Sequence, residues 1–314
     1  MPEHLLDSDD HLRELTWKLR SIVGEDNIRE NEPLSRHTSF QIGGPADLYV
    51  TPEDPDELRD VIYACRESEI PYFVLGCGSD LLVADEGYRG VIISCVEGLV
   101  NVATDGETME CQAGVPLREA SEMACELGLT GLEFACGIPG SVGGACFMNA
   151  GAYDGCMADV LESVHCLLAD GSQHTYGVDE LDFGYRRSRV RDEGLVVLSA
   201  TFALHEGDPD QIRAKMDDFT RRREEKQPLE LPSAGSTFKR PEGYFAGKLI
   251  SDAGLKGYRS GGAGVSEKHA GFVVNNGGAT AADVRSVIEH VQAEVERQFG
   301  VRLEPEDRFL GNNW

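Results

Sequence analysis

The sequence predicts an α+β protein with more than one domain. A chain of 314 residues is longer than one core usually organises, so two or three domains are expected. Its hydrophobic content of 41% and its 36 glycines are typical of a globular chain that mixes helix and strand. Helix-like and strand-like segments alternate at its start, and short strands separated by glycine loops follow.

A predicted helix and an extended segment open the chain. Apolar residues over 11–24 recur with helical spacing, and the pattern closes on Gly24. Residues 37–52 then read as extended chain interrupted by a Gly-Gly-Pro turn.

One helix and two strands follow and give the first lobe a β-α-β start. Asp54 is placed to cap a helix over 55–69 whose first residue is Pro55. A continuous apolar strand is predicted at 70–76, and a second strand at 90–94.

From about residue 97 the pattern changes to short strands and glycine loops. Residues 128–155 contain eight glycines, which gives too many turns for a regular helix interior. A third region begins near residue 207 with a helix that ends at Pro228.

The last predicted helix runs from Thr280 to Gly300. Thr280 and Asp283 have the spacing of a capping box, and Gly300 is a typical C-terminal stop.

The charge balance argues against nucleic acid as a partner. Lys and Arg total 29 against 55 Asp and Glu, so the net charge is 29 − 55 = −26. Such a chain is not expected to bind nucleic acid. The acidic residues are spread along the chain and read as a solubilising surface, although a high-salt host would favour the same composition.

The cysteines and the apolar runs predict a cytoplasmic protein without a metal. Nine cysteines occur without a C-x-x-C pair, which favours reduced, buried thiols over a metal or disulfide framework. The acidic N-terminus lacks the apolar core of a signal peptide, and no apolar run reaches the roughly 20 residues of a membrane helix. We therefore expect no membrane partner.

Two glycine-rich loops are candidate phosphate-binding segments. They are Gly76–Asp80 and Gly137–Gly144, and bare backbone N–H groups in such loops can surround a phosphate. Neither loop is a G-x-G-x-x-G dinucleotide fingerprint, because Leu81 stands where the third glycine would be. Residues 247–249 do not complete the G-x-x-x-x-G-K-[ST] motif of a P-loop. The G-x-S-x-G motif of α/β-hydrolases is also absent from the sequence. Each loop alone is more often structural than functional. Together they suggest a large phosphate ligand.

Eight segments in order resemble the UDP-N-acetylenolpyruvoylglucosamine reductase family, also called the MurB family. The resemblance extends from about residue 33 to the end of the chain. The segments are TSFQIGGPADLYV (38–50), VLGCGSDLLVADEGYRGVIIS (74–94), GIPGSVGGACFMNAGAY (137–153), FGYRRSRV (183–190), KQPLELPSAGSTFKRP (226–241), AGKLISDAGLKG (246–257), GGAGVSEKHAGFVVNN (261–276) and LEPEDRFLG (303–311).

The resemblance implies a PCMH-type FAD-binding fold of two lobes plus a C-terminal α+β substrate-binding domain. The implied parts are an N-terminal helical extension (1–32), FAD-binding lobes at 33–96 and 97–206, and a substrate-binding domain with a catalytic segment at 207–314. The chain lacks the inserted loop of larger members, so their substrate-covering tyrosine has no counterpart.

The implied reaction is the reduction of UDP-N-acetylglucosamine enolpyruvate by a monomeric enzyme. NADPH gives hydride to noncovalent FAD, and the reduced flavin passes it to the outer vinyl carbon. The inner carbon becomes enolate-like and takes a proton, which requires a cation near the carboxylate and a nearby acid.

The family motifs map the catalytic roles onto Arg186 in Y-R, Ser236 in G-S-x-F and Glu306 in L-E-x-E. Without the resemblance, these three residues would read as a surface charge, a turn hydroxyl and a solvated acid.

The resemblance also implies binding residues. Those for the cofactor are Gly76, Cys77, Gly78, Ser79, Asp80, Leu81, Gly137, Ile138, Pro139, Gly140, Ser141, Gly143, Gly144, Asn149, Ala150 and Gly151. Those for the substrate are Tyr185, Lys226, Lys239, Arg240 and His269.

Three positions depart from the family pattern. His37 and Asp80 stand where asparagine is usual, and Arg240 where asparagine often follows. Asp80 would put a carboxylate close to a pyrophosphate unless it faces away.

Three alternatives remain beside the reductase. A covalent flavin oxidase of this fold would normally place a histidine in the first loop, and 76–81 has none. A non-catalytic flavin-binding protein would not need all three catalytic residues. A nucleotide-sugar dehydrogenase that uses only NAD should show the missing fingerprint.

Overall fold

The chain divides into two compact units, each assembled from separate stretches of sequence. The computed structural model describes residues 8–311, so the first seven residues of the predicted N-terminal extension lie outside it. The first unit comprises Met1–Asn31, Asp47–Cys77 and Gly90–Thr220, and the second comprises Glu32–Ala46, Gly78–Arg89 and Arg221–Trp314. The four-part division predicted from the sequence stays a prediction.

The first unit, with the elements that cross its boundaries, holds most of the secondary structure. In chain order the elements are α1 (Ser8–Val23), β1 (Ile28–Pro33), β2 (Pro45–Val50), α2 (Pro55–Glu67), β3 (Tyr72–Leu75), β5 (Tyr88–Ser94), β6 (Val102–Asp105), β7 (Thr108–Gln112), α3 (Leu117–Glu126), β8 (Leu129–Thr130), η2 (Glu133–Ala135), α4 (Val142–Met148), β9 (Gly151–Ala152), β10 (Gly155–Cys156), η3 (Met157–Asp159), β11 (Leu161–Leu167), β12 (Gln173–Gly177), η4 (Val178–Glu180), α5 (Arg189–Asp192), β13 (Val196–Ala203), β14 (His205–Glu206) and α6 (Pro209–Lys226).

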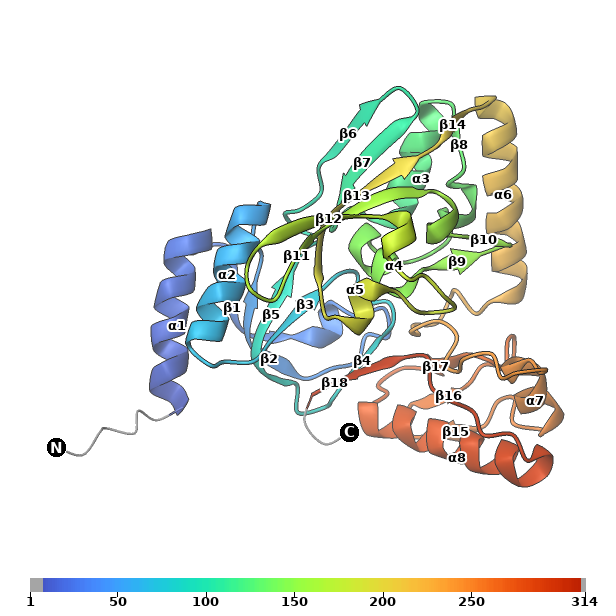
Figure 1. Ribbon diagram of the computed structural model, residues 1–314. Helices are drawn as coiled ribbons and strands as arrows, with labels where there is room; N and C mark the ends of the chain where they lie inside the picture. The colour runs from blue at the N-terminus through green and yellow to red at the C-terminus, as the bar shows by residue number, and fades with distance from the viewer. Residues whose placement is uncertain (1–7, 312–314) are drawn as a thin grey trace. The chain divides into compact units, whose positions relative to one another are not determined.

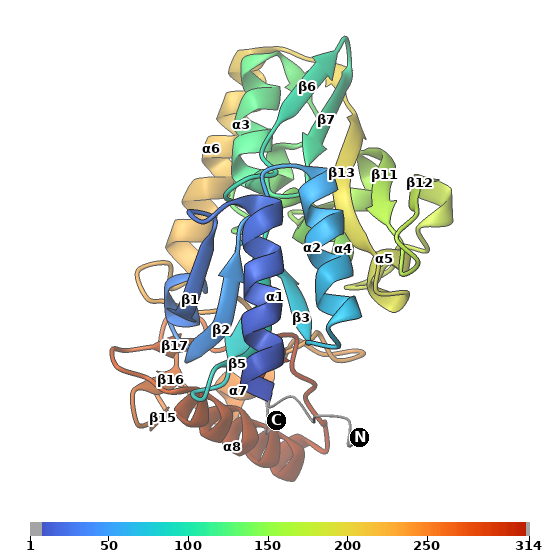
Figure 2. The same cartoon turned by 90° about the vertical axis from the view of Figure 1, so that its left-hand side faces the viewer.

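The first sheet has the strand order β1-β2-β5-β3, and β3 and β5 run parallel. Helices α1 and α2 lie side by side against it (Figures 1 and 2). Their buried leucines, among them Leu15 and Leu58, share one core with Val91 and Ile93 of β5. As predicted, the Asp54 carboxylate starts α2 by accepting from the N–H groups of the second and third residues, both at 2.8 Å.

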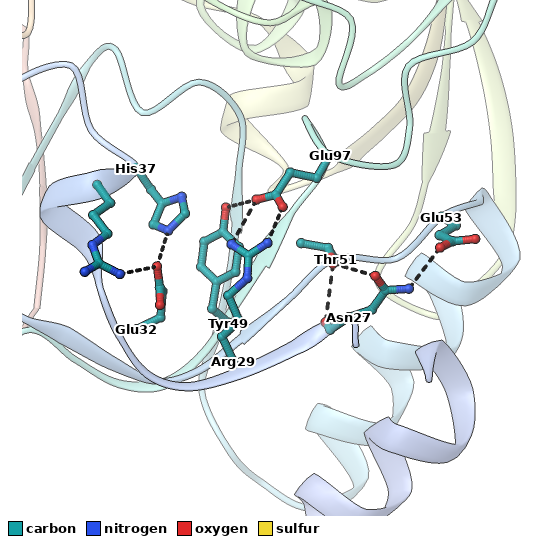
Figure 3. Close-up of polar contacts among 9 residues, drawn as sticks. Asn27, Arg29, Glu32, His37, Tyr49, Thr51, Glu53 and Glu97 are labelled. Atoms are coloured by element: carbon teal, nitrogen blue, oxygen red, sulfur yellow. Dashed lines mark hydrogen bonds and ion pairs between the residues drawn. The ribbon is translucent and has the colours of Figure 1, made fainter. Parts of the chain in front are cut away.

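A polar network links β1 and β2 to Glu97. Tyr49 of β2 donates its hydroxyl to the Glu97 carboxylate at 3.0 Å, and Arg29 of β1 pairs with the same carboxylate (Figure 3). The Arg29 guanidinium also lies 5.2 Å from the centre of the Tyr49 ring. The buried phenol is therefore hydrogen-bonded, as a buried polar group should be.

The second sheet is antiparallel in the order β12-β11-β13-β7-β6. A large core fills the space between it and α3 and α4. Three thiols, those of Cys111, Cys146 and Cys166, are buried in that core. Seven of the nine cysteines are buried, as predicted, and Cys77 and Cys156 are partly exposed.

Two sequence-based expectations in the first half were wrong in detail. The glycine-rich centre does contain a helix, α4, because Ser141 caps it and Asn149 ends it in a left-handed conformation with φ 45°. The extended segment predicted over 37–52 forms a strand only from Pro45, because Gln41 (φ 55°) and Gly43 (φ 140°) turn the chain before it.

The second unit is a small α+β assembly. Its elements are η1 (Leu34–Arg36), β4 (Leu81–Val83), α7 (Ala246–Asp252), β15 (Arg259–Ser260), β16 (Ala263–Val265), β17 (Val273–Asn275), α8 (Ala281–Phe299) and β18 (Arg308–Leu310). Strands β15, β16 and β17 form an antiparallel sheet that α8 covers (Figure 1), and β4 pairs with β18 in parallel. Phe40, Ile42 and Leu82 reach this core from early in the chain.

Helix α8 begins and ends as predicted. The Thr280 hydroxyl accepts from Asp283 N while the Asp283 carboxylate accepts from Thr280 N, and Gly300 closes the helix with φ 68°. The Asp85 carboxylate adds two hydrogen bonds, from Ala281 N at 2.7 Å and Ala282 N at 3.0 Å.

No helix among residues 8–311 combines the length and apolar character that crossing a membrane requires.

Candidate functional site

The first glycine loop joins β3 to β4. Gly78 has φ 59°, and a Cβ there would lie 2.1 Å from the His37 carbonyl oxygen, so only glycine fits. A Cβ on Gly76 would lie 2.4 Å from the Ser141 hydroxyl. The structure thus brings the start of this loop against the second glycine segment, which the sequence did not show.

The second glycine segment enters α4. Within it the Ser141 hydroxyl accepts from Gly144 N, and Val142 N and Gly143 N donate to the carbonyls of Val115 and Ala113. The first-turn N–H groups of α4 are therefore already used inside the protein. Gly143 is tightly packed as well, since a Cβ would lie 2.9 Å from that of Ala113.

Five other N–H groups in the two loops remain available to a ligand. Within the described residues, these groups donate to no protein oxygen: those of Cys77, Gly78, Ser79, Gly140 and Ser141. Consecutive backbone N–H groups without obstructing side chains suit the oxygens of a phosphate or pyrophosphate. Each of the two donor sets therefore fits phosphate oxygens such as those of the FAD expected from the sequence.

Asn149, at the end of α4, joins two neighbouring segments. Its side-chain N–H donates to the Gly184 carbonyl at 3.1 Å, and its side-chain oxygen accepts from Ala158 N at 3.1 Å. Ala150 N bonds back to Ala145 in α4, and Gly151 begins β9. In this structure Asn149 anchors the turn that follows Gly184.

Arg186 occupies that turn. Gly184 and Arg187 exchange two backbone hydrogen bonds, of 3.0 and 3.2 Å, and leave Tyr185 and Arg186 at the tip. Arg186 has φ 53°, which is uncommon for a side chain of this size. Its guanidinium lies 5.3 Å from the centre of the exposed Tyr185 ring. Strained residues held by their surroundings are frequent at functional sites.

In the second unit, Ser236 and Glu306 lie on adjacent antiparallel segments. Glu306 N donates to the Thr237 carbonyl at 2.8 Å, and Lys239 N donates to the Glu304 carbonyl at 2.9 Å. The Lys239 ammonium pairs with the Glu304 carboxylate at 3.2 Å. Main-chain hydrogen bonds thus pair Glu306 with Thr237, the residue that follows Ser236, so the two residues with predicted catalytic roles lie on paired segments.

His269 lies on the other side of the Ser236 segment. Thr237 N donates to the Gly271 carbonyl, and Gly271 N donates to His269 Nδ1 at 3.2 Å. Nδ1 is therefore the acceptor, so a neutral ring carries its proton on Nε2. Burial lowers the pKa of His269, which favours that neutral form.

The remaining predicted substrate residues are exposed cations. Lys226 is the last residue of α6, and the Arg240 guanidinium lies 4.1 Å from the centre of the exposed Phe245 ring. Arg240 directly follows Lys239 of the Ser236 segment in the chain.

One buried acid, Asp307, was not predicted from the sequence. Asp307 follows Glu306 directly and is only 5% exposed. In a charged stretch such an acid reads as solvated, and the strand pairing that buries it cannot be seen in the sequence.

Comparisons with known proteins agree with this arrangement. One family model, described as an FAD binding domain, matches residues 46–177, and another, the C-terminal domain of UDP-N-acetylenolpyruvoylglucosamine reductase, matches residues 227–310. The reductase of that name from Clostridium perfringens (strain SM101 / Type A) is 51% identical over 295 residues, which cover 94% of this chain and 97% of the relative. That from Clostridium botulinum (strain Eklund 17B / Type B) is 48% identical over 293 residues, covering 93% and 96%.

A solved structure agrees as well. The crystal structure of UDP-N-acetylenolpyruvylglucosamine reductase (MurB) from Thermus caldophilus superposes with a TM-score of 0.77 at 38% identity. The match covers 90% of this chain and all of the other.

Proposed function

The chain belongs to the UDP-N-acetylenolpyruvoylglucosamine reductase (MurB) family, and from this premise we propose that Arg186, Ser236 and Glu306 carry its catalysis. The protein is an FAD-dependent oxidoreductase that reduces UDP-N-acetylglucosamine enolpyruvate to UDP-N-acetylmuramate in peptidoglycan precursor synthesis. Its PCMH-type FAD-binding part and C-terminal reductase domain are those expected from the sequence.

The cofactor is held by the two glycine loops in this proposal. FAD, when bound, accepts a hydride from the reductant and delivers it to the substrate. The available N–H groups of Cys77, Gly78, Ser79, Gly140 and Ser141 would donate hydrogen bonds to its pyrophosphate oxygens. Attachment is noncovalent, since loop 76–81 offers no histidine.

The observation that carries the catalytic proposal is the main-chain pairing of the Ser236 and Glu306 segments. The Ser236 hydroxyl gives its proton to the inner carbon of the substrate. The Glu306 carboxyl, on the paired segment, tunes the charge around that hydroxyl. Arg186 binds the substrate carboxylate, because a planar guanidinium offers two parallel donors to it.

The substrate's nucleotide part is bound by cations and donors in this proposal. Lys226, Lys239 and Arg240 face the diphosphate, His269 donates from Nε2, and the exposed Tyr185 side chain contacts the substrate. We further propose that NADPH is the reductant and that the protein acts as a cytoplasmic monomer. Its nine cysteines, none of them in a disulfide within the described residues, suit a reducing compartment.

An anaerobic titration tests the function as a whole. The yellow flavin colour should bleach with one equivalent of NADPH and return on addition of the enolpyruvyl sugar nucleotide. NADH serves as the comparison for cofactor preference. Flavin that bleaches but is reoxidised only by oxygen would show an oxidase, and flavin that never bleaches would show a binding protein without this activity.

A further inference from the structure

Asp307 and Asp80 occupy equivalent positions at the start of two paired strands. Strands β4 and β18 are parallel with Arg308 opposite Leu81, and Arg308 N donates to the Asp80 carbonyl at 3.1 Å. Continued by one residue, this register places Asp307 beside Asp80. In-register neighbours on adjacent strands point to the same face, so the two carboxyl groups are neighbours.

The Asp307 carboxyl is buried without a compensating partner. It is 5% exposed, and within the described residues neither of its oxygens has a hydrogen-bond partner. The acidic groups that act on it are Asp80 and Glu306. A buried carboxylate flanked by negative charges is very costly, and such a group keeps its proton instead. Burial raises the pKa of Asp307 well above its usual range, and the charges of Asp80 and Glu306 raise it further.

We propose that Asp307 keeps its proton beside the Asp80 carboxylate, and that this acid pair positions both Glu306 and the loop Gly76–Leu81. The inference rests on the proposed function for the roles of Glu306 and of the loop. Asp307 is the protonated member, and its neutral carboxyl group lies beside the Asp80 carboxylate without a hydrogen bond to it. The pair then carries one negative charge instead of two, as expected for neighbouring carboxyl groups in one site.

The pair connects two parts of the proposed site. Asp80 belongs to the loop whose N–H groups are available to the pyrophosphate, and Asp307 is bonded to Glu306 in the chain. The proton on Asp307 therefore allows the Asp80 carboxylate to occupy this loop, at a position where asparagine is usual. Its loss would place two charges side by side and push β18 from β4. Glu306 would shift relative to Ser236, and the added charge would weaken the hold on a pyrophosphate.

Infrared difference spectroscopy on the FAD-loaded protein tests the proton directly. The wild-type spectrum near neutral pH should contain the carbonyl band of a protonated carboxylic acid that Asp307→Asn removes. Asp80→Asn should keep the band but let it titrate at lower pH, because one of the negative charges is gone. No such band in the wild type would overturn the proposal, whatever the enzyme's activity.

FAD affinity, followed by flavin fluorescence, tests the positioning role. In the wild type it should fall at alkaline pH, by up to tenfold per pH unit once the pair ionises. Asp307→Asn should keep its affinity over the same range, and Asp80→Asn is the second variant if Asp307→Asn fails to fold. Glu289→Gln is the control, because it removes one exposed carboxylate of α8 that pairs only with Arg285 in the described residues. A parallel loss of FAD in the wild type and Asp307→Asn would overturn the positioning role.

Discussion

Ser236 is exposed at the end of a segment whose next two residues, Thr237 and Phe238, are buried. Its hydroxyl can therefore reach a ligand while its backbone is fixed from both sides. Ser236→Ala should bleach with NADPH at nearly the native rate, since that half of the cycle needs no acid. Reoxidation by the enolpyruvyl substrate should slow on the order of 10²–10⁴-fold, the usual contribution of a positioned acid.

Rapid mixing measures the two half-reactions separately. Ser233→Ala is the matched control, because alanine retains the main-chain carbonyl that accepts from Ser39 and loses only a long hydrogen bond of 3.5 Å from Gly235 N. Equal slowing of both halves would show instead that Ser236 shapes the flavin site.

Arg186 and Arg187 are consecutive residues of one turn, so the same substitution can be compared at both positions. Arg186→Lys should lower substrate reduction roughly 10- to 100-fold, because an ammonium cannot form two parallel hydrogen bonds to a carboxylate. Arg187→Lys should leave it nearly unchanged, because the Arg187 guanidinium is exposed and pairs with Asp192 at 2.8 Å. Steady-state rates at saturating NADPH compare them. The same loss in both variants would mean that the turn needs guanidinium groups for its structure.

Asp307 also determines how stability should vary with pH. Its folded pKa is raised, so above about pH 4 the folded state keeps a proton that the unfolded chain has lost. The free energy of unfolding therefore falls as pH rises, by about 1.4 kcal/mol per pH unit until the folded pKa is reached. Asp307→Asn lacks this slope, so it should gain stability over the wild type as pH rises. Urea unfolding at several pH values would show it, and parallel curves would contradict it.

Among the elements, the contact of Gly76 with Ser141 links the first loop to the cap of α4. An alanine at 76 would force the Ser141 hydroxyl away from Gly144 N and displace a segment with available N–H groups. We expect Gly76→Ala to lose about 1 kcal/mol of stability, as for a lost cap, and to bind FAD about tenfold more weakly. Gly177→Ala is the control, since its Cβ would meet only a carboxylate oxygen at 3.6 Å. Bound flavin per protein after gel filtration reports the difference.

The sequence predicted those elements whose stabilising residues lie close together in the chain. Helices α2 and α8 were predicted because their caps, Asp54 and the Thr280/Asp283 pair, lie within a few residues. Helix α4 was missed because glycines lower helix propensity, and its local cap is supplemented by hydrogen bonds from Val142 N and Gly143 N to carbonyls of a distant segment. The pairing of β4 with β18 joins two three-residue strands far apart in the chain, and no local pattern marks it.

The same distinction applies to the site. The two glycine loops could be found from the residues, whereas Arg186, Ser236 and Glu306 needed the family resemblance. The pairing of the Ser236 segment with that of Glu306 comes from the structure. So does the burial of Asp307, which depends on the β4–β18 pairing. A long-range contact of this kind is set by tertiary packing, which residue spacing does not record.

For the whole molecule, the proposed noncovalent attachment of FAD has a simple consequence. Acid precipitation unfolds the protein and destroys a site built from backbone N–H groups. All of the flavin should then appear in the supernatant, and the apoprotein recovered by mild treatment should rebind it. Flavin absorbance in the two fractions gives the answer, and colour left in the pellet would reveal a covalent bond.

The second unit draws its core from both ends of the chain. Phe40, Ile42 and Leu82 are made early, whereas α8 and β18 leave the ribosome more than 190 residues later. During synthesis these early apolar residues cannot be buried in their core until α8 has also been synthesised. A fragment starting at residue 221 would lack them altogether, so cutting the gene there would not yield an autonomous C-terminal half. The protein is therefore a poor candidate for reassembly from two separately produced pieces divided at that point.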